Sequence, residues 1–185
     1  MATITHRHLA DAVLRVAGMS FEERDRLADE VYSRQPNLFA SVIVLHRYGA
    51  THVQMDVVLN ILLVFDEAMR ISSSSGSSGR SSSNSSNARS GASQWPVISE
   101  DVQERCLRRI SARVRFIEGL SPQLQQQAIT DAIADHPEQL LLAYVFGKFG
   151  ESDLLDVKTE AEKMLVLASL NLVECIAETA PRNPT

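Results

Sequence analysis

The sequence has little cysteine and no long apolar run. Its two cysteines, Cys106 and Cys175, form no CxxC pair, so we expect them to be buried and unbonded in a reducing cytoplasm. The densest apolar run spans nine residues, 57–65, whereas a helix needs about 20 to cross a bilayer. Charged side chains interrupt the first 19 residues, which therefore predict no signal peptide. No membrane contact is expected.

An excess of positive charge is also absent. The net charge is −5 and neither half of the chain is basic, which argues against broad binding to phosphate backbones. The sequence contains no HExxH, no glycine-rich phosphate loop and no nucleophile elbow. We therefore expect no catalytic, cofactor or metal site. Four histidines are assigned to surface and capping positions: His6, His8, His46 and His52. The acidic residues that might have formed catalytic pairs are assigned to solvated helix ends: Asp66, Glu67, Glu160, Glu162 and Glu174.

A serine-, glycine- and asparagine-rich segment, residues 71–93, interrupts a chain otherwise rich in leucine, valine and alanine. It has almost no side chain able to offset the entropy of ordering, and it predicts a disordered linker. Residues 1–70 and 94–180 are then two helical units, and residues 181–185 are a flexible tail.

The two units look like repeats. Residues 9–51 align with 110–152 at a constant offset of 101 without a gap, and six of the 43 positions are identical. The identical residues include Gly18, Ser20, Pro36 and Gly49, which begin or end helices. The similarity between the two units therefore lies at helix boundaries and at core positions.

These boundaries predict four helices in each unit. The first covers about 5–17, the second opens at Ser20 or Ser121, and the third runs from Pro36 to Gly49 or from Pro137 to Gly150. The fourth begins at Thr51 or Ser152. Its interior aligns only if the second unit has about ten extra residues, which predicts a longer fourth helix there or an extra turn before it.

The third and fourth helices are apolar nearly all round and should lie at the centre, with the first and second outside. Four short helices cannot hide that much apolar surface, so the two units should pack against each other. The predicted fold is all-α: a tandem duplication of a four-helix unit, about eight helices, packed as a pseudo-two-fold helical bundle.

Two asparagines, Asn60 and Asn171, lie inside the most apolar run of their units, where an unpaired amide would cost stability. One interpretation is that they face the junction between units and fix the register of its helices. The other is that each amide turns toward a loop or solvent. We expect the first of these arrangements at both positions.

The helix at 105–115 is rich in arginine, and Arg105, Arg109 and Arg113 form one stripe at a spacing of four. With Arg108, this face could meet nucleic acid or an acidic partner. It could equally be a solvated face neutralised by nearby acids: Glu100, Asp101, Glu104 and Glu118. The second interpretation is favoured, because the first unit has no matching stripe.

The function expected from these patterns is non-enzymatic: an adaptor, regulator or inhibitor that binds another protein through a helical surface. A homo-oligomer is compatible with the same surface. The alternative is a nucleic-acid-binding regulator that uses the arginine-rich helix at 105–115, which the negative net charge disfavours.

Overall fold

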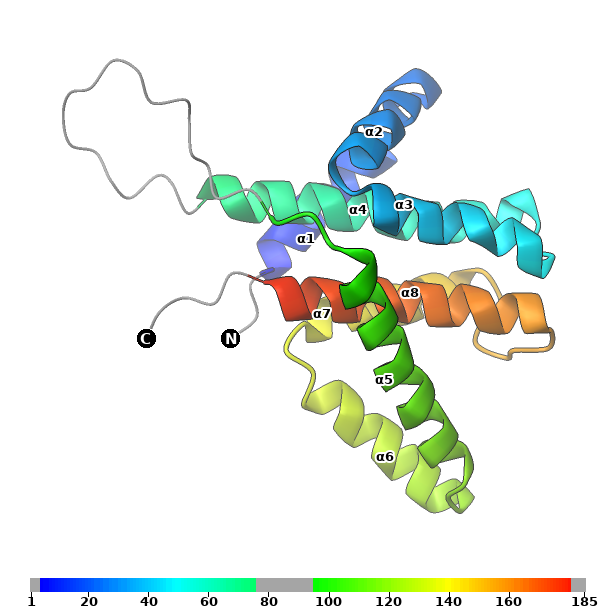
Figure 1. Ribbon diagram of the computed structural model, residues 1–185. Coiled ribbons are helices and arrows are strands. Elements are labelled where there is room, and N and C mark those ends of the chain that lie inside the picture. Colours follow the sequence, from blue (N-terminus) through cyan, green and yellow to red (C-terminus); the bar gives the residue numbers. More distant parts are fainter. Residues whose placement is uncertain (1–3, 76–94, 181–185) are drawn as a thin grey trace.

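The computed structural model describes residues 4–75 and 95–180, and these form helices and loops with no β-strand (Figure 1). In chain order the elements are α1 (His6–Ala17), α2 (Phe21–Arg34), α3 (Pro36–Ile43), the 3₁₀ helix η1 (Val44–Tyr48), α4 (His52–Ser75), α5 (Glu100–Glu118), α6 (Pro122–Ala134), α7 (Gln139–Glu151) and α8 (Glu160–Thr179). The all-α fold class is confirmed.

Local capping chemistry sets several of the helix starts. Ser20 and Glu23 exchange hydrogen bonds in a capping box before α2, and Thr51 and Gln54 do the same before α4. Pro122 occupies the first turn of α6, where its missing N–H costs nothing. These three starts match the sequence prediction because the signals act within four residues.

The third helix of each unit departs from its predicted bounds. α3 ends at Ile43, and the chain tightens into η1 before Gly49, whose φ of 86° is left-handed. In the second unit α7 begins only at Gln139 and continues through Gly150. At the offset of 101 the buried Leu38 aligns with the exposed Gln139, so the alignment does not pair core residues at the start of these helices.

The expected start of α8 at Ser152 is wrong. Residues 152–159 form a loop, which the buried side chain of Leu154 anchors, and a capping box between Thr159 and Glu162 opens the helix at Glu160. The extra residues therefore precede the helix, and α8 has 20 residues against 24 in α4.

The predicted linker also begins too early. Ile71–Ser75 continue α4 as its last turn, so helical structure extends five residues into the segment assigned to the linker. Residues 76–93 of the linker and the predicted tail, 181–185, lie outside the described residues.

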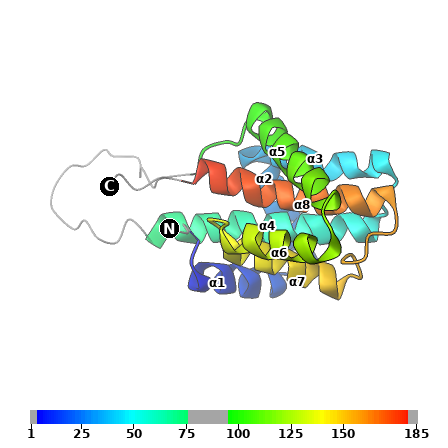
Figure 2. The ribbon, with the colours of Figure 1, turned by 90° about the horizontal axis from the view of Figure 1, so that it is seen from below.

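The centre of the molecule is formed by α4 and α8, which lie side by side and run in the same direction (Figures 1 and 2). Every residue from 61 to 69 in α4 is buried, as is every residue from 171 to 176 in α8. Burial of each large apolar side chain there, such as Phe65 or Leu172, contributes about 1.5–3 kcal/mol. The fourth helices are therefore central, as predicted. The third helices were expected to share the centre and are buried only in part, with two buried residues in α3 and four in α7.

The other helices cover this pair. α1 packs along α4, and α5 packs across α8. α2 and α6 extend away on opposite sides (Figure 1). α2 buries only Leu27 and Val31, and α6 buries no residue fully, as expected of outer helices.

A short segment before α5 is held on the first unit by side-chain amides. Gln35 donates from its amide nitrogen to the Pro96 carbonyl (3.0 Å) and accepts from the Ile98 N–H (2.9 Å). Asn37 donates to the Ile98 carbonyl (2.9 Å). Because Trp95 and Ile98 are buried as well, the start of the second unit is part of the core of the first. We call the contacts of Gln35 with Pro96 and Ile98 the Gln35 clamp.

Candidate interaction surfaces

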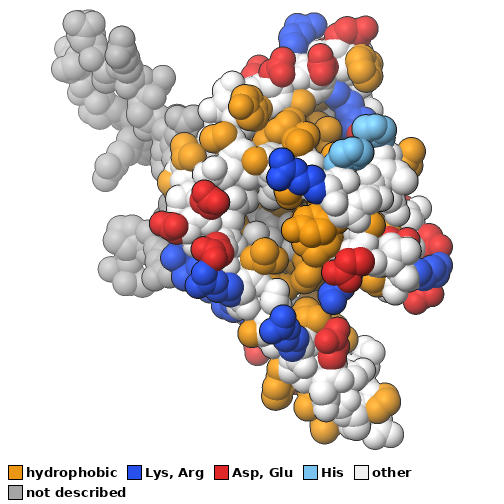
Figure 3. Space-filling view, turned by 45° about the vertical axis from the view of Figure 1, so that its right-hand side comes forward, with side chains coloured by type: hydrophobic (Ala, Val, Ile, Leu, Met, Phe, Trp, Pro, Cys, Tyr) orange, Lys and Arg blue, Asp and Glu red, His pale blue; other side chains and the backbone are white. Residues whose placement is uncertain are grey.

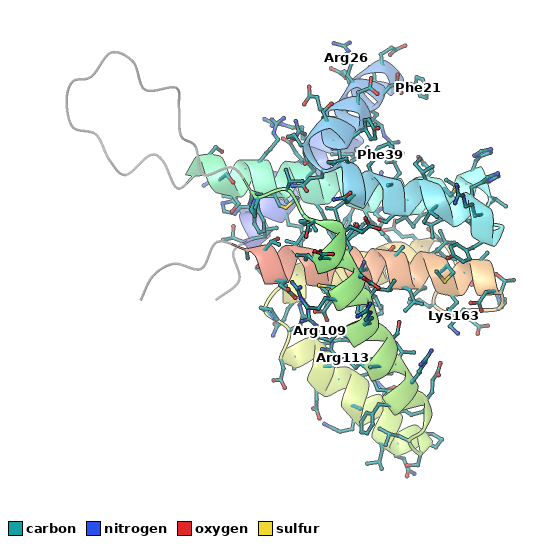
Figure 4. The ribbon with its side chains drawn as sticks, viewed as in Figure 1. Phe21, Arg26, Phe39, Arg109, Arg113 and Lys163 are labelled. Atoms are coloured by element: carbon teal, nitrogen blue, oxygen red, sulfur yellow. The ribbon has the colours of Figure 1, made fainter. Side chains whose placement is uncertain are left out.

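The arginine stripe of α5 is paired with α8. Arg105 donates through two nitrogens to Glu178, and Arg113 donates to Glu174 (3.1 Å). Arg109 lies 3.0 Å from each of these two carboxylates. Figure 4 shows Arg109 and Arg113 on α5. Hydrogen bonding from Arg105 lowers the pKa of Glu178. We call these five residues the α5–α8 charge cluster.

This pairing corrects the expectation about which acids neutralise the stripe. Of the four nearby acids proposed, only Glu104 has an arginine partner among the described ion pairs, and that partner is Arg108, on the outer side. The neutralising carboxylates are Glu174 and Glu178, more than 60 residues along the chain. Only the tertiary fold brings them together.

Glu174 was also expected at a solvated helix end, together with Asp66 and Glu67, and the structure overturns this for all three. They are buried: Glu67 accepts from Arg15, and Asp66 accepts from Arg34 (2.6 Å). Burial raises the pKa of Asp66, which the hydrogen bond from Arg34 partly offsets. These acidic side chains therefore link helices across the interior.

A cleft of about 660 Å³ opens beside the α5–α8 charge cluster, between α5, α8 and the turn that follows α6. His136 forms part of its wall, and the side chain of His136 is 5% exposed. The imidazole Nδ1 accepts from the backbone N–H of Glu138 (3.0 Å). Nε2 has no hydrogen-bond partner among residues 4–75 and 95–180, and a carboxylate oxygen of Glu174 is 3.8 Å away.

The two asparagines occupy different environments. Asn60 accepts a hydrogen bond from the Tyr144 hydroxyl (3.3 Å), which connects α4 to α7 of the other unit. Burial raises the pKa of Tyr144 to about 12, so the hydroxyl remains a donor near neutral pH. Asn171 is buried, and its side-chain oxygen accepts from Cys175 within α8 (3.7 Å). Asn171 is thus buried and Asn60 partly buried.

The remaining histidines and the cysteines of the described residues do not form a further binding site. No group of three histidine, cysteine or acidic side chains among the described residues could hold a metal ion. His46 and His52 stack on each other with ring centroids 5.9 Å apart. Cys106 and Cys175 are buried free thiols, as expected, and burial raises both pKa values. Within 4–75 and 95–180 the helices are also too short or too polar to cross a bilayer.

An apolar surface that the sequence analysis did not identify lies where α2 meets α3. Tyr32 is 58% exposed and stands edge-on to Phe39, with ring centroids 5.6 Å apart. One turn further along α3, Ile43 is 55% exposed. We call Tyr32, Phe39 and Ile43 the α2–α3 strip; Figure 4 shows Phe39 at the junction of the two helices. Apolar side chains also gather across the middle of the face in Figure 3.

Comparison of the chain with protein families, with curated proteins and with solved structures gives no match.

Proposed function

We propose that the protein is a non-enzymatic module that binds another protein through the α2–α3 strip. The observation that carries the proposal is the exposure of Tyr32 and Ile43 on either side of Phe39. Tyrosine supplies a large, rigid contact with a polar tip, and such side chains are common among the residues that dominate binding energy. A protein with this surface acts as an adaptor, a regulator or an inhibitor of its partner.

The test is capture of the partner from a lysate of the native host, with matched variants. We expect Ile43→Asp to weaken binding by about 30-fold, since loss of one dominant apolar contact costs about 2 kcal/mol. Leu124→Asp is the control, because Leu124 is 56% exposed but lies on α6. A partner that both variants retain equally would refute the role of the strip. If the captured partner is the chain itself and Ile43→Asp yields a monomer, the module is a homo-oligomer.

The alternative, a nucleic-acid-binding regulator, is disfavoured by the α5–α8 charge cluster. Arg105, Arg109 and Arg113 each donate to a carboxylate of α8, and phosphate contacts would have to compete with those bonds. Salt-sensitive binding of DNA or RNA that Arg108→Glu abolishes without unfolding would favour this alternative. Arg108 is suited to this test because its side chain is 75% exposed.

We also infer that the fold is a duplicated four-helix unit with a pseudo-two-fold axis. Two observations support this inference. α1 packs on α4 as α5 packs on α8. Seven residues after the aligned Asn60 and Asn171 come Glu67 and Glu178, and each accepts from an arginine of the first helix of its own unit. A cytoplasmic location is proposed with it, because two buried free thiols fit a reducing compartment.

A further inference from the structure

The wall of the cleft between α5, α8 and the α6–α7 turn contains a buried hydrogen-bond donor for which the described residues supply no acceptor. Because Nδ1 of His136 accepts from the Glu138 N–H, the neutral imidazole carries its proton on Nε2. That nitrogen is buried and unpartnered. A buried donor without an acceptor costs about 1–3 kcal/mol, and an acceptor placed in the cleft would recover this energy.

The arginines beside this donor retain unused N–H groups. A guanidinium has five N–H donors, and Arg113 donates to Glu174 through one terminal nitrogen. Arg109 uses one terminal nitrogen for both carboxylates, and its side chain lines the cleft. Three guanidinium groups meet two carboxylates in the α5–α8 charge cluster, so one positive charge is in excess there. Asp135 lines the cleft too, and it is exposed.

We propose that this cleft binds a small oxyanion, the phosphate or carboxylate group of a small molecule, between His136 and the guanidinium groups of Arg109 and Arg113. Charge-assisted hydrogen bonds from arginine are shorter and stronger than those between neutral groups. The imidazole Nε2–H has almost no exposed surface in the wall, and it becomes a further donor once the anion seats against the His136 side chain. Glu174 and Glu178 hold the arginines in position, and Asp135 disfavours ligands with high negative charge. The proposal does not depend on the α2–α3 strip.

The experiment follows the imidazole directly. The full chain, with ¹⁵N-labelled histidine, is titrated with inorganic phosphate and separately with acetate, at constant ionic strength maintained with chloride. We expect a saturable shift of the His136 nitrogen signals. Saturation by phosphate at a lower concentration than acetate identifies a phosphorylated ligand, and the reverse order identifies a carboxylate. His136→Gln assigns the signals.

Variants on one helix provide the matched comparison. Arg113→Gln should weaken the affinity for the anion by about tenfold or more. Arg108→Gln should leave the affinity unchanged, since Arg108 pairs with Glu104 outside the cleft. No saturable shift with either anion, or equal loss in both variants, would overturn the proposal. If Arg113→Gln unfolds the protein, the wild-type titration alone still decides between binding and no binding.

Discussion

At the scale of single residues, buried polar side chains hold this molecule together. Gln35, Asp66, Glu67, Glu174 and His136 are all buried within or beside apolar helices. The partners of the first four come from other segments of the fold. A buried polar group without a partner is costly, so each pairing limits how its helices can pack.

The Gln35 clamp gives the first prediction. Gln35→Ala removes both bonds to the backbone of residues 96–98 and leaves a buried N–H and a carbonyl without partners. We expect the free energy of unfolding to fall by about 1–3 kcal/mol, measured by urea denaturation. Gln123→Ala, at an exposed position of α6, should change it by less than about 0.5 kcal/mol. Equal effects of the two substitutions would contradict the clamp.

His136 predicts how stability depends on pH. Burial lowers the pKa of His136, an effect that Arg113 and Arg109 increase and Glu174 opposes. The unfolded chain, with a histidine pKa near ~6.5, therefore binds a proton that the native state resists. The contribution of neutral His136 to the free energy of unfolding is therefore fully present above pH ~6.5 and is lost as the pH falls toward the lowered pKa of the native state. We expect His136→Gln to reduce the loss of stability between neutral and acidic pH. If the urea midpoint of His136→Gln falls with pH as steeply as that of the wild type, His136 is not the source of the pH dependence.

At the scale of helices and turns, prediction from sequence succeeded where the determining contacts are local. The starts of α2, α4 and α6 follow from capping residues within one turn. The capping box of Thr159 and Glu162 that begins α8 is just as local, but the repeat alignment placed the start at Ser152 instead. The Gln35 clamp and the partners of Glu174 could not be predicted from local signals, because more than 60 residues separate the groups.

Two glycines give a prediction about elements. Gly49 ends η1 with a φ of 86°, whereas Gly147 lies inside α7, and an added Cβ would contact nothing within 4 Å at either position. Only the backbone conformation distinguishes them. Gly49→Ala should cost about 1–2 kcal/mol of unfolding free energy because the left-handed region is strained for alanine. Gly147→Ala should add about 1 kcal/mol by favouring the helix. Stability changes of the same sign in thermal unfolding would contradict this assignment.

At the scale of the whole molecule, the two halves form a single packed unit. α4 contacts α8 and α7, and the Asn60–Tyr144 hydrogen bond crosses the same junction. The sequence predicted that the halves would bury their apolar helices together, because the composition of α4 and α8 already required it. It did not predict that segment 95–98 belongs with the first half, since that depends on a few amide contacts.

The connection between the halves gives the last prediction. Deleting about half of residues 76–93 should raise the melting temperature by only about 1–2 °C, because halving a loop lowers its closure cost by about 0.6 kcal/mol. The deletion must not reach Ile71–Ser75, which belong to α4. A matched deletion that removes residues 72–75 should be destabilising. A large drop on trimming 76–93 alone would show that the segment does more than connect.

The two sides of the Gln35 clamp are synthesised at different times. Residues 4–75 leave the ribosome before Trp95 and Ile98. The surface that these two side chains cover therefore stays exposed for about 1–5 s at ordinary elongation rates. During that interval α4 also lacks α8, and its apolar side is open to chaperones or to the same helix of a neighbouring nascent chain. The order of translation therefore exposes the first half to mispairing between chains, and rapid emergence of the 95–98 segment is its earliest protection.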